Sequence, residues 1–393
     1  MKSNAQSMKT VVFTGGGTGG HIYPGLAVVD ELKEKINSTK IDGKSLDVQI
    51  VWIGSSKGMD KNLVEKSGSV DKFIGIPCGK LRRYFSFQNF IDLFKIAAGF
   101  ISAFFQLAKL KPLVVFSKGG FVSVPSCYAA KLLKIPVFTH ECDFSTGLAT
   151  RLNLKVAEKL LVSYEETKTK LHASIQEKTI VTGNPVRPIF YNADKNKGLE
   201  FVFSSKENSS TIIENSNLQK PILLVVGGSL GAKQINLLVW KNLEELCKNF
   251  IVIHQTGKKQ DYFVDVSHPD YYPFEFIYSQ MADVMACADV ILSRSGANSL
   301  WEAVVQYKPM VLIPLSVAGS RGDQVENAKY FEKKGCAINL DSENLTDEVF
   351  LQTMTEILSE QKRKNMIESC KNLCGSEKPA KKIAEIIFNK ILN

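Results

Sequence analysis

Hydrophobic and polar positions along the chain form two kinds of run that follow one another. Short apolar runs such as 10–13, 48–53 and 114–116 precede longer stretches with the spacing of an amphipathic helix, for example 26–35 and 57–66. This alternation is typical of parallel β-sheets covered by helices. Glycine and polar residues gather where the apolar runs end, and ligands bind at that edge of an open parallel sheet. The chain is therefore predicted to be an α/β protein with its sites at strand ends.

The pattern occurs twice, which predicts two domains. Further strands are predicted in the first half at 135–139, 160–162 and 180–181, and in the second half at 222–226, 250–254, 274–277, 290–292 and 310–315. Residues 183–188 have the composition of a linker, and 191–220 is a polar stretch predicted to be a weakly structured surface insertion. We therefore expect two Rossmann-like, doubly wound domains facing a cleft, at 1–184 and 185–376.

The end of the chain carries one more helical pattern. Residues 379–392 have amphipathic spacing, with Pro379 in the first turn, where proline is tolerated. We expect the segment 377–393 to pack back on the first domain and to brace the two domains together.

Composition narrows the class of protein. The chain has 393 residues, 44% of them hydrophobic and 23% charged, which is typical of a globular protein with more than one core. The net charge of +9 favours an anionic partner, such as a nucleic acid, an anionic lipid or a phosphorylated substrate. The eight cysteines are scattered, so neither a disulfide framework nor a zinc site is expected. Residues 1–10 lack the apolar core of a signal peptide, so a cytoplasmic protein is expected.

A basic and aromatic segment is the candidate membrane contact. We expect its side chains to meet anionic lipid: Leu81, Arg82, Arg83, Tyr84 and Phe85. The following stretch, Phe90–Leu110, is apolar but is interrupted by Asp92, Lys95, Gln106 and Lys109. An amphipathic helix is therefore expected in place of a spanning one. From Phe94 onward its apolar side chains are expected to pack in the core.

The stretch 14–24, TGGGTGGHIYP, combines a glycine turn with a histidine at the start of a predicted helix. Backbone amides can approach a ligand closely at the glycines, and a helix N-terminus favours an anion. The turn matches GxGxxG, but a nicotinamide enzyme also needs an acidic residue after the second strand, where residues 54–56 are Gly-Ser-Ser. We interpret His21 as a general base or a ligand contact, with a capping or core histidine as the alternative.

A second glycine turn, at 227–231, opens the second half. Ser229 in that turn is either a helix cap or a diphosphate contact, and the two roles are compatible. Glu302 lies in the predicted helix that follows Ser295, and a solvated surface glutamate is the alternative to a binding role. Each half therefore opens with its own glycine turn.

Seven short motifs together resemble the MurG family of bacterial glycosyltransferases, within glycosyltransferase family 28. They are GGGTGGH at 15–21, SKGGFVSVP at 117–125, HECD at 140–143, TGNPVR at 182–187, GGSLGA at 227–232, ADVILSRSGANSLWE at 288–302 and GDQVENA at 322–328. Each motif is weak alone, but their order and spacing make the set specific. The resemblance implies the GT-B fold, which consists of two Rossmann-like domains.

The resemblance also implies the reaction. Enzymes of this family transfer GlcNAc from UDP-GlcNAc to the 4-hydroxyl of MurNAc in undecaprenyl-pyrophosphoryl-MurNAc-pentapeptide, with inversion to a β-1,4 link. Such an enzyme would be peripheral on the cytoplasmic face of the cell membrane, on an anionic surface and beside other cell-wall synthesis proteins, with no nucleic acid partner. No DxD metal motif is evident, so no cofactor or metal ligand is expected, and stimulation by a divalent cation is left open.

Site residues follow from the resemblance position by position. The implied donor contacts are Arg187, Ser229, Ile277 through its backbone, Ser295, Glu302 and Gln324. The implied contacts of the acceptor are Gly17, Thr18, Gly19, Gly20, Lys118, Gly119, Gly120 and Glu141. His21 is the first candidate for the base and Asp143 the second, although many relatives read HEQN where this chain has HECD. The rival functions are a GT-B transferase with a glycolipid acceptor, a nicotinamide-dependent oxidoreductase and a non-catalytic nucleotide-sugar binding module.

Overall fold

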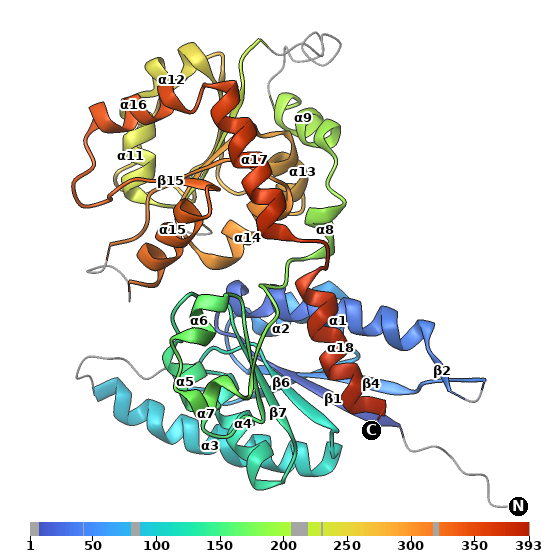
Figure 1. Ribbon diagram of the computed structural model, residues 1–393. Helices are drawn as coiled ribbons and strands as arrows, with labels where there is room; N and C mark the ends of the chain where they lie inside the picture. Colours follow the sequence, from blue (N-terminus) through green and yellow to red (C-terminus); the bar gives the residue numbers. More distant parts are fainter. Residues whose placement is uncertain are drawn as a thin grey trace, which may run out of the picture. The chain divides into compact units, whose positions relative to one another are not determined.

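The chain forms two compact units, each built around its own parallel sheet (Figure 1). The computed structural model describes residues 8–41, 43–79, 87–205, 219–228, 231–316 and 322–392. The first unit is Met1–Arg187 together with Glu377–Asn393, and the second is Pro188–Ser376. The chain thus enters the second unit after Arg187, where the sequence predicts the boundary after Asn184.

The first unit holds a seven-stranded sheet in the order β5-β4-β1-β6-β7-β8-β9. Its strands are β1 (Lys9–Thr14), β4 (Val48–Ser55), β5 (Lys72–Ile76), β6 (Val114–Ser117), β7 (Val137–Glu141), β8 (Lys159–Val162) and β9 (Thr179–Val181). Its helices are α1 (Gly19–Ser38), α2 (Asp60–Ser67), α3 (Phe87–Leu110), α4 (Ser123–Leu132), α5 (Leu148–Leu154), α6 (Glu165–Thr169), α7 (Ala173–Gln176) and α18 (Pro379–Leu392). The short strands β2 (Lys40–Ile41) and β3 (Lys44–Ser45) form a separate antiparallel pair.

The core of the first unit joins the sheet to α1 and α18. The ring of Phe13 in β1 lies 6.1 Å from that of Trp52 in β4 and 5.3 Å from that of Phe116 in β6. The apolar stripe of α18 packs into the same cluster, and Figure 1 shows α18 beside α1. Lys9 at the start of β1 donates a hydrogen bond of 2.6 Å to the carbonyl of Ile391. The last helix of the chain therefore belongs to the core of the first unit.

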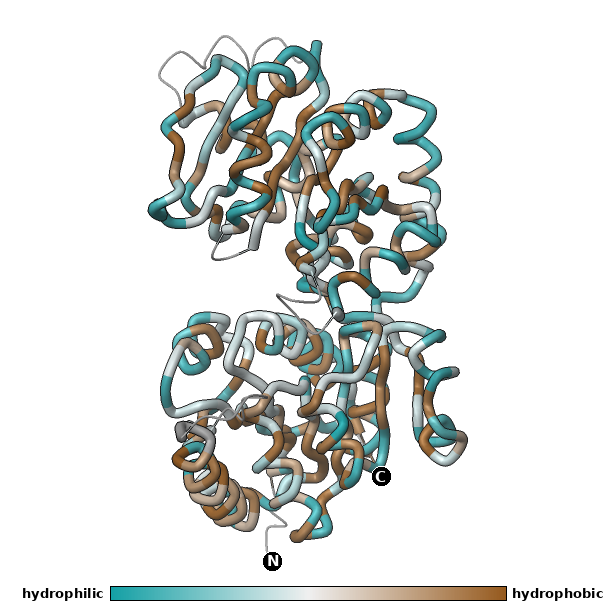
Figure 2. The backbone as a smooth tube through the Cα atoms, turned by 90° about the vertical axis from the view of Figure 1, so that its left-hand side faces the viewer, coloured by the Kyte–Doolittle hydropathy of each residue, from teal (hydrophilic) through white to brown (hydrophobic). Residues whose placement is uncertain are grey.

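The second unit holds a six-stranded parallel sheet in the order β12-β11-β10-β13-β14-β15. Its strands are β10 (Ile222–Val226), β11 (Ile251–Gln255), β12 (Tyr271–Phe274), β13 (Val290–Ser293), β14 (Met310–Leu312) and β15 (Ala337–Asn339). Its helices are α8 (Pro188–Tyr191), α9 (Lys195–Phe203), α11 (Lys233–Lys241), α12 (Leu243–Asn249), α13 (Met281–Cys287), α14 (Ala297–Val305), α15 (Asp323–Lys333), α16 (Asp347–Glu356) and α17 (Glu360–Cys374). In both units the central strands consist largely of buried apolar residues, and the interior of each unit is mostly brown in Figure 2.

Two predicted elements differ from the structure. The strand predicted at 274–277 begins earlier, as β12, because Tyr271 and Tyr272 are buried and Tyr271 hydrogen-bonds within the core. The insertion predicted at 191–220 is helical in its first part: Asp194 caps α9, and Val202 and Phe203 are buried as α9 packs on α13. Two buried apolar side chains are enough to hold this helix because a neighbouring helix covers them. Residues 206–218 of the predicted insertion lie outside the described residues.

The prediction that α3 buries its apolar side chains from Phe94 onward is confirmed for one face of the helix and wrong for the other. Phe90, Phe94 and Phe105 are 60%, 64% and 66% exposed, and Ile101 is exposed as well. The opposite face packs on α4 and the sheet, where Ala103 and Leu107 are fully buried. The helix is therefore apolar on both faces, and only one of them meets the core.

Candidate active site

The switch point of the first sheet brings together the two turns predicted to bind the acceptor. β1 and β6 are neighbours, and Thr14 is paired with Ser117 where both strands end. The strand order reverses between them, and ligands of open α/β sheets bind outside the strand ends at such a point. The glycine turn at 15–20 and the turn at 117–120 therefore lie side by side.

His21 lies in the first turn of α1, against the second glycine turn. A Cβ atom on Gly120 would lie 2.9 Å from Cδ2 of His21, and one on Gly119 would lie 3.8 Å from its Nδ1. Gly120 also has a φ of +77°, a region that disfavours side chains. Thr18 precedes α1 without a side-chain capping bond, and the first turn, which the structure describes in full, contains no acidic residue. The imidazole thus lies in the first turn of a helix that begins with Gly19 and Gly20 and has no side-chain cap from Thr18.

Asn153 of α5 anchors the second turn, and the sequence analysis missed it. Its Nδ2 donates to Oγ of Ser117 at 3.0 Å and to Oγ of Ser123 at 2.8 Å. Ser117 Oγ also accepts the N–H of Gly119 at 3.1 Å, and Ser123 Oγ donates to the carbonyl of Gly120 at 2.8 Å. Buried, mutually bonded polar groups of this kind hold a turn rigid. Nothing in the local sequence marks Asn153 because its partners are far away in the chain.

Asp60 is the second residue that the sequence analysis missed. It is only 1% exposed, and its Oδ1 and Oδ2 accept the N–H groups of Gly17 and Ser55, each at 2.9 Å. A carboxylate therefore does lie beside the end of the second long strand of the sheet, but it binds the backbone of the chain itself. The Gly17 amide, a predicted acceptor contact, is already used by this bond. The signal that could have revealed Asp60 is an acidic residue at a predicted helix start after that strand.

Glu141 shapes the loop that follows β7. Its Oε1 accepts the N–H groups of Cys142 at 2.9 Å and Asp143 at 3.1 Å, and its Oε2 accepts that of Gly147 at 2.8 Å. The side chain is buried. The carboxylate that was assigned to the acceptor thus holds the loop that carries Asp143.

Lys118 is buried beside His140 and Cys142. It is 1% exposed, and its ammonium nitrogen has no hydrogen-bond partner in the part of the chain that the structure describes. Burial holds the pKa of His140 well below its usual value, and the charge of Lys118 lowers it further. The Nε2–H of His140 donates to the carbonyl of Gly183 at 3.0 Å, so Nδ1 of the neutral ring carries no proton.

The ligand atoms of Glu141, Cys142 and Asp143 lie within 4.8 Å of one another, as in a metal site. Their chemistry disfavours a cation. The Glu141 carboxylate already accepts three N–H groups, burial raises the pKa of the Cys142 thiol to about 12, and Lys118 places a positive charge nearby. We therefore assign this cluster to the structure of the loop.

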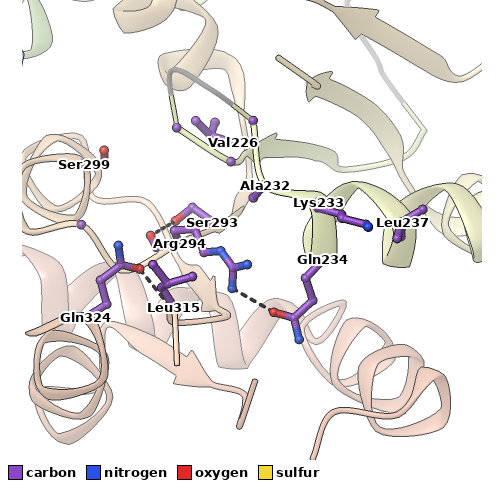
Figure 3. A pocket seen from close by; sticks show the side chains of 14 residues that line it. Val226, Ala232, Lys233, Gln234, Leu237, Ser293, Arg294, Ser299, Leu315 and Gln324 are labelled. Carbon is purple, nitrogen blue, oxygen red and sulfur yellow. Dashed lines mark hydrogen bonds between the residues drawn. The ribbon is translucent and has the colours of Figure 1, made fainter. Parts of the chain in front are cut away.

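The switch point of the second sheet opens into a cavity of about 760 Å³ (Figure 3). Val226 of β10 is paired with Ser293 of β13 where both strands end. The cavity is lined by the glycine turn after β10, the start of α11, the turn after β13, and Leu315 and Gln324. Ser229 belongs to that glycine turn but lies outside the described residues.

Gln324 has a fixed orientation at the cavity. Its Oε1 accepts the N–H group of Leu315 at 3.0 Å (Figure 3) and that of Ser295 at 3.3 Å. Since the oxygen is committed to two donors, the amide nitrogen is the group left for a ligand. Ser295 itself is fully buried, and Gly296 and Ser299 line the cavity in its place.

Arg294 is a cavity residue to which the sequence analysis gave no role. Its Nη1 donates to Oε1 of Gln234 at 3.0 Å (Figure 3). The same nitrogen donates to the carbonyls of Ile313 at 2.9 Å and Pro314 at 3.1 Å. Burial lowers its pKa, but a guanidinium stays charged at neutral pH. Lys233 lines the same cavity. Two cationic side chains next to a glycine turn suit an anionic ligand such as a diphosphate.

Besides Ser295, three predicted donor residues do not line this cavity. Ile277 is buried, and its N–H donates to Oε1 of Gln255 at 3.0 Å. Glu302 is half-buried in α14. Arg187 belongs to the first unit, where its guanidinium lies 4.5 Å from the centre of the Tyr23 ring.

A buried polar network fixes α11, the helix that follows the glycine turn of the second unit. Trp240 Nε1 donates to Tyr271 Oη at 2.9 Å, and this hydroxyl donates to Nδ1 of His254 at 3.0 Å. His254 Nε2 donates to Asn236 Oδ1 at 3.1 Å, and Asn236 Nδ2 donates to the Thr256 carbonyl at 2.7 Å. Burial lowers the pKa of His254 to about 3, so the ring is neutral in the folded protein.

We expect the second unit to lose stability as the pH falls below about 6.5. An unfolded histidine titrates near 6.5 and folded His254 near 3, so the unfolded state binds more protons between these values. His254 alone should make the fold about 2 kcal/mol less stable at pH 5 than at pH 7. Urea unfolding followed by Trp240 and Trp301 fluorescence measures this. His254→Gln should flatten the dependence, exposed His172→Gln is the control, and equal slopes in all three proteins would contradict the prediction.

Known proteins match along nearly the whole chain. The family model of the glycosyltransferase family 28 N-terminal domain matches residues 11–162, and that of the C-terminal domain matches residues 222–387. A relative from Treponema denticola, named UDP-N-acetylglucosamine--N-acetylmuramyl-(pentapeptide) pyrophosphoryl-undecaprenol N-acetylglucosamine transferase, is 49% identical over 97% of this chain and 97% of its own. A relative of the same name from Treponema pallidum is 40% identical over 89% of this chain and 87% of its own.

A solved structure supports the same relationship. The crystal structure of MurG from Acinetobacter baumannii has a TM-score of 0.69 and 25% identity to this chain, and the match covers 97% of this chain and 99% of that one. The predicted fold class, two doubly wound parallel-sheet domains of GT-B type, is confirmed. The chain belongs to glycosyltransferase family 28.

Proposed function

We propose that this protein transfers GlcNAc from UDP-GlcNAc to the 4-hydroxyl of MurNAc in undecaprenyl-pyrophosphoryl-MurNAc-pentapeptide, with inversion. The observation that carries the proposal is the identity of 49% to a transferase named for this substrate, over 97% of both chains. The protein is a hexosyltransferase that makes the lipid-linked precursor of peptidoglycan. Its two ligands are UDP-GlcNAc and the lipid-linked acceptor.

The second unit binds the donor. The cavity at the β10–β13 switch point takes the diphosphate and the sugar, with Lys233 and Arg294 facing the negative charge. Gln324 donates its amide N–H to a sugar hydroxyl because its oxygen is held by two backbone amides. As UDP leaves, its developing charge is stabilised by these cations and by the start of α11.

The first unit binds the acceptor and supplies the base. His21 lies in the first turn of α1 and beside the second glycine turn, so a sugar hydroxyl bound there is within reach of its imidazole. Removing the proton makes the 4-hydroxyl oxygen a better nucleophile toward the anomeric carbon of GlcNAc. Asp143, on the loop held by Glu141, is the second candidate for this role.

The transfer assay tests the proposal directly. Purified protein is incubated with labelled UDP-GlcNAc and either the lipid-linked MurNAc-pentapeptide or a diacylglycerol, which represents the glycolipid alternative. We expect label in the MurNAc product only. Transfer to diacylglycerol without transfer to the MurNAc acceptor would overturn the proposed function.

The exposed face of α3 gives the protein a means of reaching its lipid-linked acceptor. We place this face, which contains Phe90, Phe94, Ile101 and Phe105, on the cytoplasmic surface of the cell membrane. Phe90–Leu110 is long and apolar enough to cross a membrane, but its other face is buried in the core of the first unit. A helix with one face in a protein core lies along the surface of a bilayer.

Replacing Phe94 and Phe105 by glutamate should weaken binding to vesicles of anionic phospholipid by about tenfold per side chain. Sedimentation with the vesicles measures the bound fraction. Leu132→Glu, which changes another exposed apolar residue of the first unit, is the control and should bind like the unmodified protein. Unchanged sedimentation of the double variant would remove α3 from the membrane contact.

The basic segment at 81–85, predicted from the sequence to meet anionic lipid, lies outside the described residues. The same sedimentation experiment with Arg82→Glu and Arg83→Glu tests it separately.

A further inference from the structure

Asp60 joins three segments of the first unit at one point. It is the first residue of α2, it follows the end of β4, and it accepts the Gly17 amide of the glycine turn. The hydrogen bonds from Gly17 and Ser55 are both 2.9 Å long, and the carboxylate is almost fully buried. Hydrogen bonds to a carboxylate are stronger than those to a neutral acceptor. The glycine turn is therefore tied firmly to the neighbouring strand.

The glycine turn is also held from its other side. The indole N–H of Trp52 donates to the carbonyl of Gly15 at 3.1 Å. Between these two anchors, a Cβ on Gly16 would lie 1.9 Å from Oδ2 of Asp60, so no side chain fits there. Residues 15–17 thus lead into α1 along a path fixed by Trp52 and Asp60.

The charge of Asp60 restricts what this part of the turn can bind. Its carboxylate fills the space beside Gly16 and uses the Gly17 amide, so a phosphate would meet both a steric block and a like charge there. The groups that we assign to the acceptor's diphosphate are the start of α1, where the Thr18 side chain makes no capping bond, and the second turn. Residues 15–17 therefore fix the position of the start of α1.

We propose that Asp60 is a positioning residue for the transfer reaction: it fixes the path of residues 15–17 and thereby the start of α1, from which His21 reaches the acceptor hydroxyl. The proposal rests on the proposed function because it assigns a role in the same reaction. It predicts that Asp60 affects turnover while the donor, bound by the second unit, is held as before.

Asp60→Asn is the first test. Asparagine replaces one carboxylate oxygen by an NH₂ group, which then faces a backbone N–H donor. We expect kcat for the lipid-linked acceptor to fall by up to about 100-fold through displacement of His21, with KM for UDP-GlcNAc unchanged. Asp60→Glu keeps both oxygens and should recover part of the activity. UDP binding by each variant verifies that the second unit is folded.

Asp71→Asn is the matched control in the same unit. Asp71 Oδ2 also accepts a backbone N–H, that of Ile50 at 2.7 Å, but near the opposite end of β4. In Asp71→Asn a carboxylate is likewise replaced by an amide, and kcat should stay at the value of the unmodified protein. An equal loss of kcat in both variants would show a general effect on stability and overturn the proposal.

A double-mutant cycle separates positioning from other roles. When His21 is already replaced by alanine, adding Asp60→Asn should lower kcat further by less than about twofold, because the residue through which Asp60 acts is gone. If the fold-losses of kcat in the two single variants multiply in the double variant, the two residues act independently and the proposal is overturned. Amide hydrogen exchange at 15–21 should be faster in Asp60→Asn even without substrate, and unchanged exchange would also count against it. Absence of transfer by the unmodified enzyme would instead overturn the proposed function.

Discussion

Replacing His21 by alanine is expected to lower kcat by about 10²- to 10⁴-fold and to leave UDP binding nearly intact. The loss is the usual contribution of a positioned general base. UDP binding should persist because the cavity that we assign to the donor lies in the second unit, whereas His21 lies in the first. Single-turnover transfer measures the chemical step, and calorimetry with UDP measures the binding.

Two further variants complete this experiment. His172→Ala changes an exposed histidine of the same unit and should keep full turnover. Asp143→Asn tests the second candidate for the base. Full turnover by His21→Ala together with its loss in Asp143→Asn would transfer the role to Asp143. A collapse of UDP binding in His21→Ala would assign His21 to donor binding or folding.

Gln324→Glu is expected to raise KM for UDP-GlcNAc by about 10- to 100-fold. The first carboxylate oxygen can keep the bonds from Ser295 and Leu315, but the second replaces the N–H donor that we assign to the sugar. The new negative charge would also repel the donor's diphosphate, and juxtaposed like charges cost several kcal/mol. Initial rates at varied UDP-GlcNAc measure the change.

The matched control for charge is Gln361→Glu. Gln361 is exposed on α17 of the same unit and does not line the cavity, so KM should stay unchanged. A KM that is also unchanged in Gln324→Glu would remove Gln324 from the donor site.

Much of the fold could be predicted because its determinants are local. Apolar runs flanked by glycine and polar turns identified β1, β4, β10 and β13, whose carboxyl ends carry the two candidate sites. The predicted C-terminal helix at 379–392 agrees with α18, since proline in its first turn and an apolar stripe specify both its start and its packing. The doubly wound class of both sheets followed from the alternation of strands and helices, which leaves few topologies.

The predictions that were wrong depended on how elements pack against one another, which the local sequence pattern does not show. The apolar side chains of α3 looked like core residues because composition does not reveal whether another helix covers a given face. α9 looked weakly structured because its few apolar residues are enough only when α13 packs against them. β12 begins before the predicted strand because Tyr271 finds its partners, Trp240 and His254, on other elements.

The sequence by itself determined that two glycine turns open two similar units, that His21 stands at the start of a helix, and which family the motifs resemble. Only the tertiary structure decided what each polar group does. Gly17 and Asp60 are 43 positions apart, and Ser117 and Asn153 are 36 apart, yet both pairs are hydrogen-bonded at the switch point. Spacing along the chain cannot reveal such pairs, because the sheet brings the ends of distant strands together. The glycine loop that looked open to an anion is thus partly filled by the chain's own carboxylate.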